Sequence, residues 1–312
     1  MVMTVAGLLI RAIVVLAGTA IITFALLWHA PGDPAQAIAM ARFDALLTED
    51  IIDEVRREVG LDTNFWTAFR AWIGPLLVLD LGNSAVTGRP VWPDLWTSMT
   101  YTFPLALASL GVGMALSIPL AILATRRPGG LLDRSAVAIA SLGTAIPAFW
   151  LGLLLILLFA VQLDWLPAMG ARTPAHAILP ALTLGLGVAA SLTRIIRSGI
   201  LEARGQSFLP ALKRRGVPKR AIGRDHVAPH AAIPVVTVAG LEFAFLLEGL
   251  VIVEVIFGRP GLGTFLTSAI VARDFPHVQA VVVVTALVFV TVNLVIDLIY
   301  RQIDPRIGEH DA

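Results

Sequence analysis

Six apolar segments, each long enough to cross a lipid bilayer, constrain this chain more than any other feature of its sequence. The hydrocarbon core of a bilayer is about 30 Å thick and needs roughly 20 apolar residues per helix. Of the 312 residues, 57% are hydrophobic and only 14% are charged, which excludes a water-soluble globular domain. The segments cover residues 5–28, 101–125, 135–163, 173–193, 229–257 and 275–300. The sequence therefore predicts an all-α membrane protein with six transmembrane helices.

The distribution of basic residues predicts the orientation of these helices. A basic block over residues 200–234 holds the two lysines, Lys213 and Lys219, together with several arginines, whereas residues 30–93 contain more Asp and Glu than Arg. Cytoplasmic connections carry the excess of Lys and Arg in membrane proteins. Both chain ends are therefore expected on the cytoplasmic side. The first apolar segment contains Arg11 and no convincing cleavage site, so we expect it to be retained as a span.

This orientation divides the chain into four parts. They are a first transmembrane helix (5–28), an outer insert (30–95), a five-helix core (97–301) that contains the basic block, and a cytoplasmic tail (302–312). Within the insert, residues 48–59 show helical spacing of apolar residues, with Thr48 as the expected N-cap and Gly60 as the end. A small helical insert over the outer mouth is predicted.

The basic block itself has the pattern of a short helix with its own beginning and end. Ser207 can cap it, Pro210 is tolerated in its first turn, and Gly216 would terminate it. An exposed basic face with Arg214 and apolar residues could fill a groove on a partner; the apolar residues are Phe208, Leu209 and Leu212. The alternative is an ordinary topology-determining loop whose charges face lipid headgroups.

Several kinds of site are missing from the sequence. The two lysines follow Leu212 and Pro218, so no Gly-Lys-Ser/Thr phosphate-binding loop exists and any ATP hydrolysis belongs to another chain. The chain has no cysteine, and His226 and His230 lack a third metal ligand. We therefore expect no catalysis, no bound metal or cofactor and no nucleic-acid partner. The glycine-rich run 258–263 is interpreted as a tight turn or re-entrant hairpin.

The fifth segment carries three glutamates, and two of them, Glu248 and Glu254, are candidates for a translocation pathway, because charges within a bilayer usually face a bundle interior or an aqueous cavity. Glu242, Glu248 and Glu254 are six residues apart and cannot share one helix face. Glu248 could line the pathway and favour a cationic substrate, pair with an arginine of a partner, or be a neutral buried acid. Glu254 is interpreted as structural or gate-lining.

Two further polar residues, Thr144 and Asn293, complete the predicted pathway set. Asn293 also begins a series with Asp297 and Arg301 at spacings of four, for which a helix-stabilising ion pair is expected.

Several motifs resemble those of one family. Glu202-Ala203-Arg204-Gly205-Gln206, followed by Gly216 and Ala232-Ile233-Pro234, resembles the EAA loop of ABC importer permeases. Other runs resemble the dipeptide/oligopeptide/nickel permease group in particular: Pro31-Gly32-Asp33-Pro34, Gly60-Leu61-Asp62, Asp80-Leu81-Gly82-Asn83-Ser84, Gly88-Arg89-Pro90-Val91, Ile252-Val253-Glu254, Pro260-Gly261-Leu262-Gly263, Arg273-Asp274 and Asp304-Pro305-Arg306. This chain departs from the group in the loop, at Ser207-Phe208 and Pro210-Ala211-Leu212.

The resemblance implies a type I ABC importer-like fold and a permease subunit for peptides or a related solute such as a nickel chelate, in a bacterial inner membrane. It implies that the loop forms a coupling helix in a cleft of the ATPase, with Glu202, Ala203 and Gly205 among the coupling residues. The implied partners are two ATPase subunits that carry ATP and Mg, a second homologous permease, a periplasmic or lipid-anchored binding protein, and membrane lipid.

The alternative function is a self-contained proton-coupled secondary transporter that uses the membrane glutamates. Six spans without an inverted repeat make this class less attractive. A requirement for a separate ATPase chain would distinguish the two.

Overall fold

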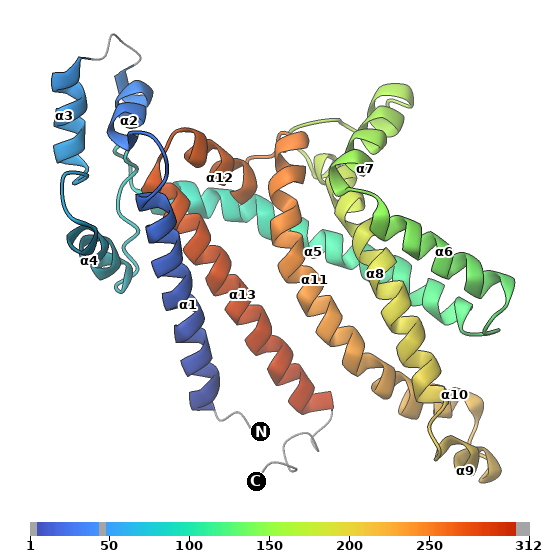
Figure 1. Ribbon diagram of the computed structural model, residues 1–312. Coiled ribbons are helices and arrows are strands. Elements are labelled where there is room, and N and C mark those ends of the chain that lie inside the picture. Colours follow the sequence, from blue (N-terminus) through green and yellow to red (C-terminus); the bar gives the residue numbers. More distant parts are fainter. Residues whose placement is uncertain (1–4, 44–47, 304–312) are drawn as a thin grey trace. The chain divides into compact units, whose positions relative to one another are not determined.

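The computed structural model describes residues 5–43 and 48–303, and helices account for most of these residues (Figure 1). The long helices are α1 (Val5–Trp28), α5 (Val91–Ala124), α8 (Ile178–Arg204), α11 (Ala228–Ile256) and α13 (Phe275–Ile303). The shorter ones are α2 (Pro34–Phe43), α3 (Glu49–Glu58), α4 (Phe65–Leu76), α6 (Leu131–Ala145), α7 (Ala148–Leu155), α9 (Leu209–Arg214), α10 (Lys219–Ala221) and α12 (Leu262–Val271). Two π-helical segments, η1 (Ile156–Gln162) and η3 (Ile222–Val227), and a 3₁₀ turn, η2 (Pro174–Ala177), connect them.

The helices divide into two compact units. The first comprises Phe103–Arg259 and the end of α13 from Thr291, and the second comprises residues 5–102 and Pro260–Val290. In the described ranges, five helices are long and apolar enough to cross a membrane, and a bent helix pair would make a sixth span. The predicted all-α membrane fold is confirmed.

The third predicted span is not one continuous helix. α6 and α7 meet at an angle of 100° on either side of Ile146 and Pro147 (Figure 1). Proline lacks the amide donor that would continue the helix, and it pushes the preceding residue out of the helical region. Ile146 accordingly has extended backbone angles, φ −82° and ψ 122°. The prediction of an uninterrupted helix over residues 135–163 was therefore wrong at Pro147.

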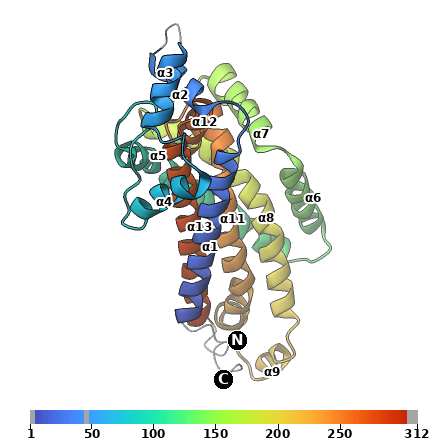
Figure 2. The ribbon, with the colours of Figure 1, turned by 60° about the vertical axis from the view of Figure 1, so that its left-hand side comes forward.

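Glycines allow the helices of the first unit to approach closely. A Cβ atom on Gly113 of α5 would lie 2.4 Å from Val188 of α8. A Cβ atom on Gly199 of α8 would lie 3.3 Å from the carbonyl oxygen of Ala231 in α11. Small residues at helix contacts are typical of membrane bundles, where van der Waals packing drives association. α8 and α11 consequently lie side by side (Figure 1 and Figure 2).

The insert of the second unit has a small core of its own, formed where α2 and α3 pack together. α3 ends as the sequence predicted, because Gly60 adopts φ +72° and the amide of Leu61 donates to Arg56 O at 2.9 Å. Thr48 occupies the N-cap position, but its side chain makes no capping hydrogen bond. The core consists of Ala35, Ile38, Ala39, Ile52, Val55 and Ala85.

A second apolar cluster of this unit joins the beginning of α5 to α12 and α13. Val91 and Leu95 pack with Leu262 and Val281. The glycine-rich run 258–263 forms a turn, as one of its two interpretations predicted: Gly258 has φ +56°, and α12 begins directly after Gly261.

Candidate coupling loop, pathway residues and motif network

A short helix lies in the predicted place within the basic loop (Figure 2). α8 ends at Arg204 and α9 begins at Leu209, which puts Pro210 in the first turn, as expected. The predicted cap was wrong. Phe208 occupies the N-cap position without a side-chain hydrogen bond, and Ser207 lies in the preceding turn.

Gly216 ends α9 in a Schellman motif. Its φ is +76°, its amide donates to Lys213 O at 3.1 Å, and the amide of Val217 donates to Leu212 O at 3.2 Å. A residue with a Cβ atom would be strained in this left-handed conformation. Gly216 therefore ends α9 through its backbone conformation, as the sequence predicted.

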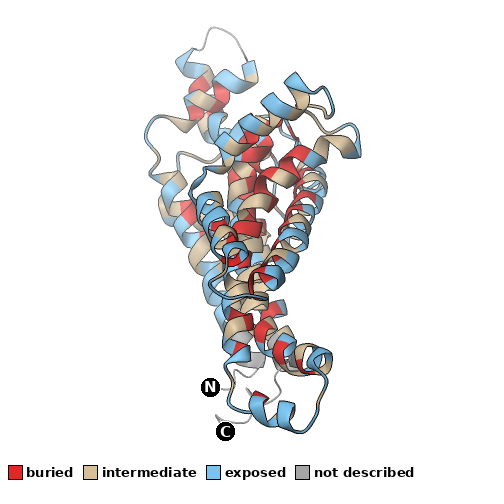
Figure 3. Cartoon of the chain, turned by 90° about the vertical axis from the view of Figure 1, so that its right-hand side faces the viewer, coloured by how far each residue is buried: buried red, intermediate tan, exposed pale blue. Residues whose placement is uncertain are grey.

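Most of the loop surface is exposed (Figure 3), but not every residue predicted to face a partner is available. Leu209 is buried within the chain, so its predicted place on the exposed face was wrong. Phe208 and Arg214 are exposed, and Leu212 is half-buried.

A cavity behind the loop brings together motif residues that are distant in the sequence. Its lining comes from the end of α8 and the beginning of α11: Gly199, Glu202, Ala203, Gln206, His230, Ile233 and Pro234. The Phe208 ring lies 6.1 Å from the His226 ring and 5.8 Å from the His230 ring. The two histidines thus pack around an aromatic ring. Among the described residues, no group of three or more His, Cys, Asp or Glu is placed to hold a metal ion.

The C-terminal half of α8 is hydrogen-bonded to the first turn of α6 and to the connection that precedes it. The buried Asp133 accepts hydrogen bonds from the guanidinium of Arg197 and, at 2.8 Å, from the amide of Gly129. Arg204 donates to Thr125 O at 2.5 Å, just beyond the end of α5. In the sequence, Arg204 belongs to the EAA-like motif, and no pattern indicates a hydrogen-bond partner for Arg197 or Arg204. The one available signal was Asp133 itself, an acidic residue between Arg127 and Arg134 in the sequence.

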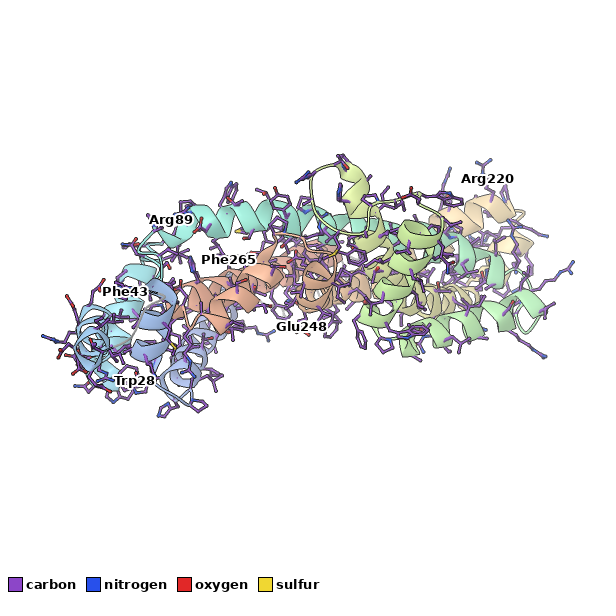
Figure 4. The ribbon with its side chains drawn as sticks, turned by 90° about the horizontal axis from the view of Figure 1, so that it is seen from above. Trp28, Phe43, Arg89, Arg220, Glu248 and Phe265 are labelled. Atoms are coloured by element: carbon purple, nitrogen blue, oxygen red, sulfur yellow. The ribbon has the colours of Figure 1, made fainter. Side chains whose placement is uncertain are left out.

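The predicted pathway residues differ in exposure. Glu248 is exposed on α11 (Figure 4) and forms no hydrogen bond or ion pair within the described ranges. Glu254 is 0% exposed, and its backbone carbonyl accepts a 2.8 Å hydrogen bond from the amide of Arg259. This burial favours the structural interpretation of Glu254 over the gate-lining one.

The other two predicted pathway residues lie in the same unit. Thr144 is exposed and donates to Ser141 O at 3.0 Å, and Asn293 is half-buried. The Arg301 side chain, with which an ion pair was expected, lies outside the described side chains. The pathway roles of all four residues stay predictions.

Glu242, which was not in the predicted pathway set, lines a cavity of about 150 Å³ in the first unit. Gly143 and Ile146 of the α6 end and Phe245 of α11 lie in the same lining. A glutamate beside the break at Pro147 could not be recognised from the sequence, because the break was not predicted.

Motif residues of the second unit meet around one carboxylate. Asp274 accepts hydrogen bonds from Ser84 Oγ at 2.5 Å, from the Ala85 amide at 3.0 Å and from His277 Nδ1 at 2.6 Å. Burial by itself raises the pKa of Asp274, but the hydrogen bonds from His277 and Ser84 outweigh it, so this pKa lies below its ordinary value.

The neighbouring Arg273 holds the first motif of the insert. It donates to Pro31 O at 2.6 Å, and a Cβ atom on Gly32 would lie 2.7 Å from the guanidinium. Asp33 accepts from the Ala35 amide at 2.9 Å and from Arg56 at 2.6 Å. The motifs at 31–34, 80–84 and 273–274 are therefore parts of one polar network, whereas the motif at 304–306 lies outside the described residues.

The described residues combine helices long and apolar enough to span a membrane, an exposed basic loop with its own helix and a helical insert. Residues 117–309 match the family of binding-protein-dependent transport system inner membrane components. The chain belongs to this family.

Relatives of known type match nearly the whole chain. The glutathione transport system permease protein GsiC of Escherichia coli O6:H1 is 38% identical over 291 residues, which cover 92% of each chain. The protein of the same name from Pectobacterium atrosepticum is 37% identical over 277 residues, which cover 89% of each chain.

Solved structures share the fold. An inward-facing structure of the MetNI methionine ABC transporter has a TM-score of 0.58 at 19% identity and covers 68% of this chain and 96% of its own. An amino acid ABC transporter solved with histidines has a TM-score of 0.54 at 19% identity and covers 67% of this chain and 94% of its own.

The chain is thus a multi-pass inner-membrane permease subunit of a binding-protein-dependent ABC importer, as the sequence resemblance implied. Such a subunit works with an ATPase and a substrate-binding protein. Family membership decides against a self-contained secondary transporter.

Proposed function

We propose that this permease imports short peptides, with glutathione as a representative cargo. The observation that carries the proposal is the 38% identity, over 92% of the chain, to a permease named for glutathione transport. A pathway glutamate such as Glu248 would favour those peptides that carry an additional positive charge.

The driving force comes from ATP and Mg bound on two separate ATPase subunits, and this chain itself binds no cofactor. α9 is the docking helix: it is short, it ends in a Schellman motif, and its Phe208 and Arg214 are exposed. ATP-driven closure of the ATPase pair would displace α9 and, through Gly205 and the end of α8, the bundle. The hydrogen bonds of Arg197 to α6 and of Arg204 to the connection after α5 would carry this displacement further.

A second homologous permease completes the pathway, and a periplasmic or lipid-anchored binding protein delivers the cargo. Both chain ends lie on the cytoplasmic side in this arrangement. The excess of basic residues in the loop that carries α9 supports this orientation.

The test is reconstitution. The tagged chain is purified gently, its co-purifying subunits are identified, and the assembly is placed in proteoliposomes with its binding protein. Uptake of labelled glutathione and dipeptides should require ATP and the binding protein. Uptake of a nickel chelate in place of peptides would overturn the substrate assignment, and uptake without an ATPase would overturn the coupling.

A further inference from the structure

α4 is an apolar helix with no place in either core of its unit. Its twelve residues, FWTAFRAWIGPL, include no buried residue. At 1.5 Å per residue it is about 18 Å long, too short to cross a bilayer core of about 30 Å. An apolar helix of this length is usually either buried in a protein core or placed at a membrane surface. Because no residue of α4 is buried, the helix is not part of a protein core.

The exposed residues of α4 and the turn after it include four large apolar side chains, beside the polar Thr67 and the charged Arg70. Trp66 is 68% exposed, and Leu77, Val78 and Leu79 are 79%, 78% and 81% exposed. Leu79 adopts the left-handed conformation with φ +62°, which is uncommon for a non-glycine residue. Contiguous apolar surface of this kind marks an interaction with a protein or a membrane.

Contacts with α1 place α4 at the end of a membrane span. The ring of Phe24 lies 5.2 Å from that of Phe69 and 5.5 Å from that of Trp72, and the Trp28 ring lies 5.9 Å from that of Phe65. The candidate span of α1 ends at Trp28 (Figure 1 and Figure 4). Tryptophans at span ends lie at the level of the lipid headgroups. α4 therefore packs against the end of α1, on which the apolar side chains of Ile22 and Leu26 are exposed.

A cavity of about 330 Å³ lies between α4, α1 and the first turn of α13. Phe24, Trp28, Trp72 and Phe275 contribute aromatic walls. The candidate span of α13 begins at Phe275, so the cavity lies where two spans end. An apolar cavity at this level suits the acyl chain of a membrane lipid.

We propose that α4 is an interfacial helix, with Trp66 and the turn 77–79 immersed in lipid between the headgroups and the acyl chains. Such a helix lies in the plane of the membrane surface and binds through its buried apolar area. It would hold the α2–α3 insert beside the membrane, a role that does not depend on the transported cargo.

The absence of cysteine from the chain allows a direct test. Single cysteines are introduced by Trp66→Cys and Val78→Cys, spin-labelled, and examined in the complete transporter in phospholipid nanodiscs. Val14→Cys on the exposed face of the α1 span is the lipid reference, and Glu54→Cys on the exposed face of α3 is the water reference. Each variant must retain wild-type ATP hydrolysis.

Labels at positions 66 and 78 should collide with oxygen several-fold more often, relative to a water-soluble nickel complex, than the label at 54. A ratio equal to that at position 54 would overturn the proposal. Low collision rates with both reagents would also overturn it, because they would show that a partner subunit or a second copy covers α4.

A second measurement needs no substitution. A phospholipid with a photoreactive acyl chain, added to nanodiscs that hold the unaltered transporter, should label peptides covering α4 and leave those covering α3 unlabelled. Equal labelling of the two helices, or labelling of neither, would contradict the lipid contact.

Discussion

Ser84 Oγ donates a 2.5 Å hydrogen bond to Oδ2 of Asp274, across 190 positions of sequence. Asp274 directly precedes α13, and its backbone carbonyl accepts the amide of Val278 in the first turn of that helix. Ser84 Oγ in turn accepts the Thr87 amide at 2.9 Å. One serine hydroxyl therefore joins the loop at 80–91 to the start of a membrane-spanning helix.

Ser84→Ala should loosen this loop. A hydrogen bond to a charged group contributes about 1.5–3 kcal/mol, and its loss leaves a buried carboxylate with one partner fewer. We expect faster hydrogen exchange of amides in residues 80–91. Thr87→Ala, which alters an exposed side chain of the same loop, is the control and should change exchange little. Equal effects of the two substitutions would show that Ser84 has no special role.

The lowered pKa of Asp274 predicts a pH dependence for the same loop. The unfolded value of an Asp pKa is about 3.9. The folded-state pKa of Asp274 is depressed, so the ionised carboxylate stabilises the folded loop. This stabilisation is fully present above about pH 4 and is lost as the pH falls through the folded-state pKa. Protection of the Ala85 amide should stay constant from pH 7 to about 4 and then decrease. Asp274→Asn should remove this acid-dependent step, and loss of protection already near pH 6 would contradict the assignment.

Arg197→Ala should destabilise the first unit more than Arg194→Ala. Arg197 pairs with the buried Asp133. Arg194, which lies three residues earlier on α8, is exposed. Removal of one partner leaves a buried charge without compensation, which costs more than removal of both. The thermal midpoint of the detergent-solubilised chain measures the effect. The double variant Asp133→Ala/Arg197→Ala should recover part of the loss, and a strictly additive result would argue against the pair.

Gly216→Ala should weaken the end of α9 and, under the proposed coupling, reduce uptake per ATP hydrolysed. The left-handed conformation costs a non-glycine residue about 1–2 kcal/mol. Gly223→Ala is the matched control, because a Cβ atom there meets nothing within 4 Å and its φ is not positive. Both variants should insert into the membrane normally. Uptake per ATP that is unchanged in the Gly216 variant would count against α9 as the coupling element.

The spans and helix ends could be predicted because each depends on residues that are close in sequence. α1 is apolar except for Arg11 and two threonines, and Gly216 needs only its own positive φ and its neighbours' carbonyls to end α9. The choice of Phe208 over Ser207 as the N-cap depends instead on how the chain leaves α8. The Asp133–Arg197 pair joins residues 64 positions apart, and no local pattern distinguishes it from surface charges.

The difference between Glu248 and Glu242 gives a test of the pathway. Glu248 is exposed on α11, whereas Glu242 lines the small cavity beside the α6–α7 break. If Glu248 contacts cargo, Glu248→Gln should lower uptake of cationic peptides several-fold relative to neutral ones, because the attraction to a carboxylate is lost. Competition between lysine-containing and alanine-only dipeptides in proteoliposomes measures this preference, with Glu242→Gln for comparison. Loss of assembly with the second permease would instead indicate pairing across subunits, and an unchanged preference with intact assembly would remove Glu248 from the pathway.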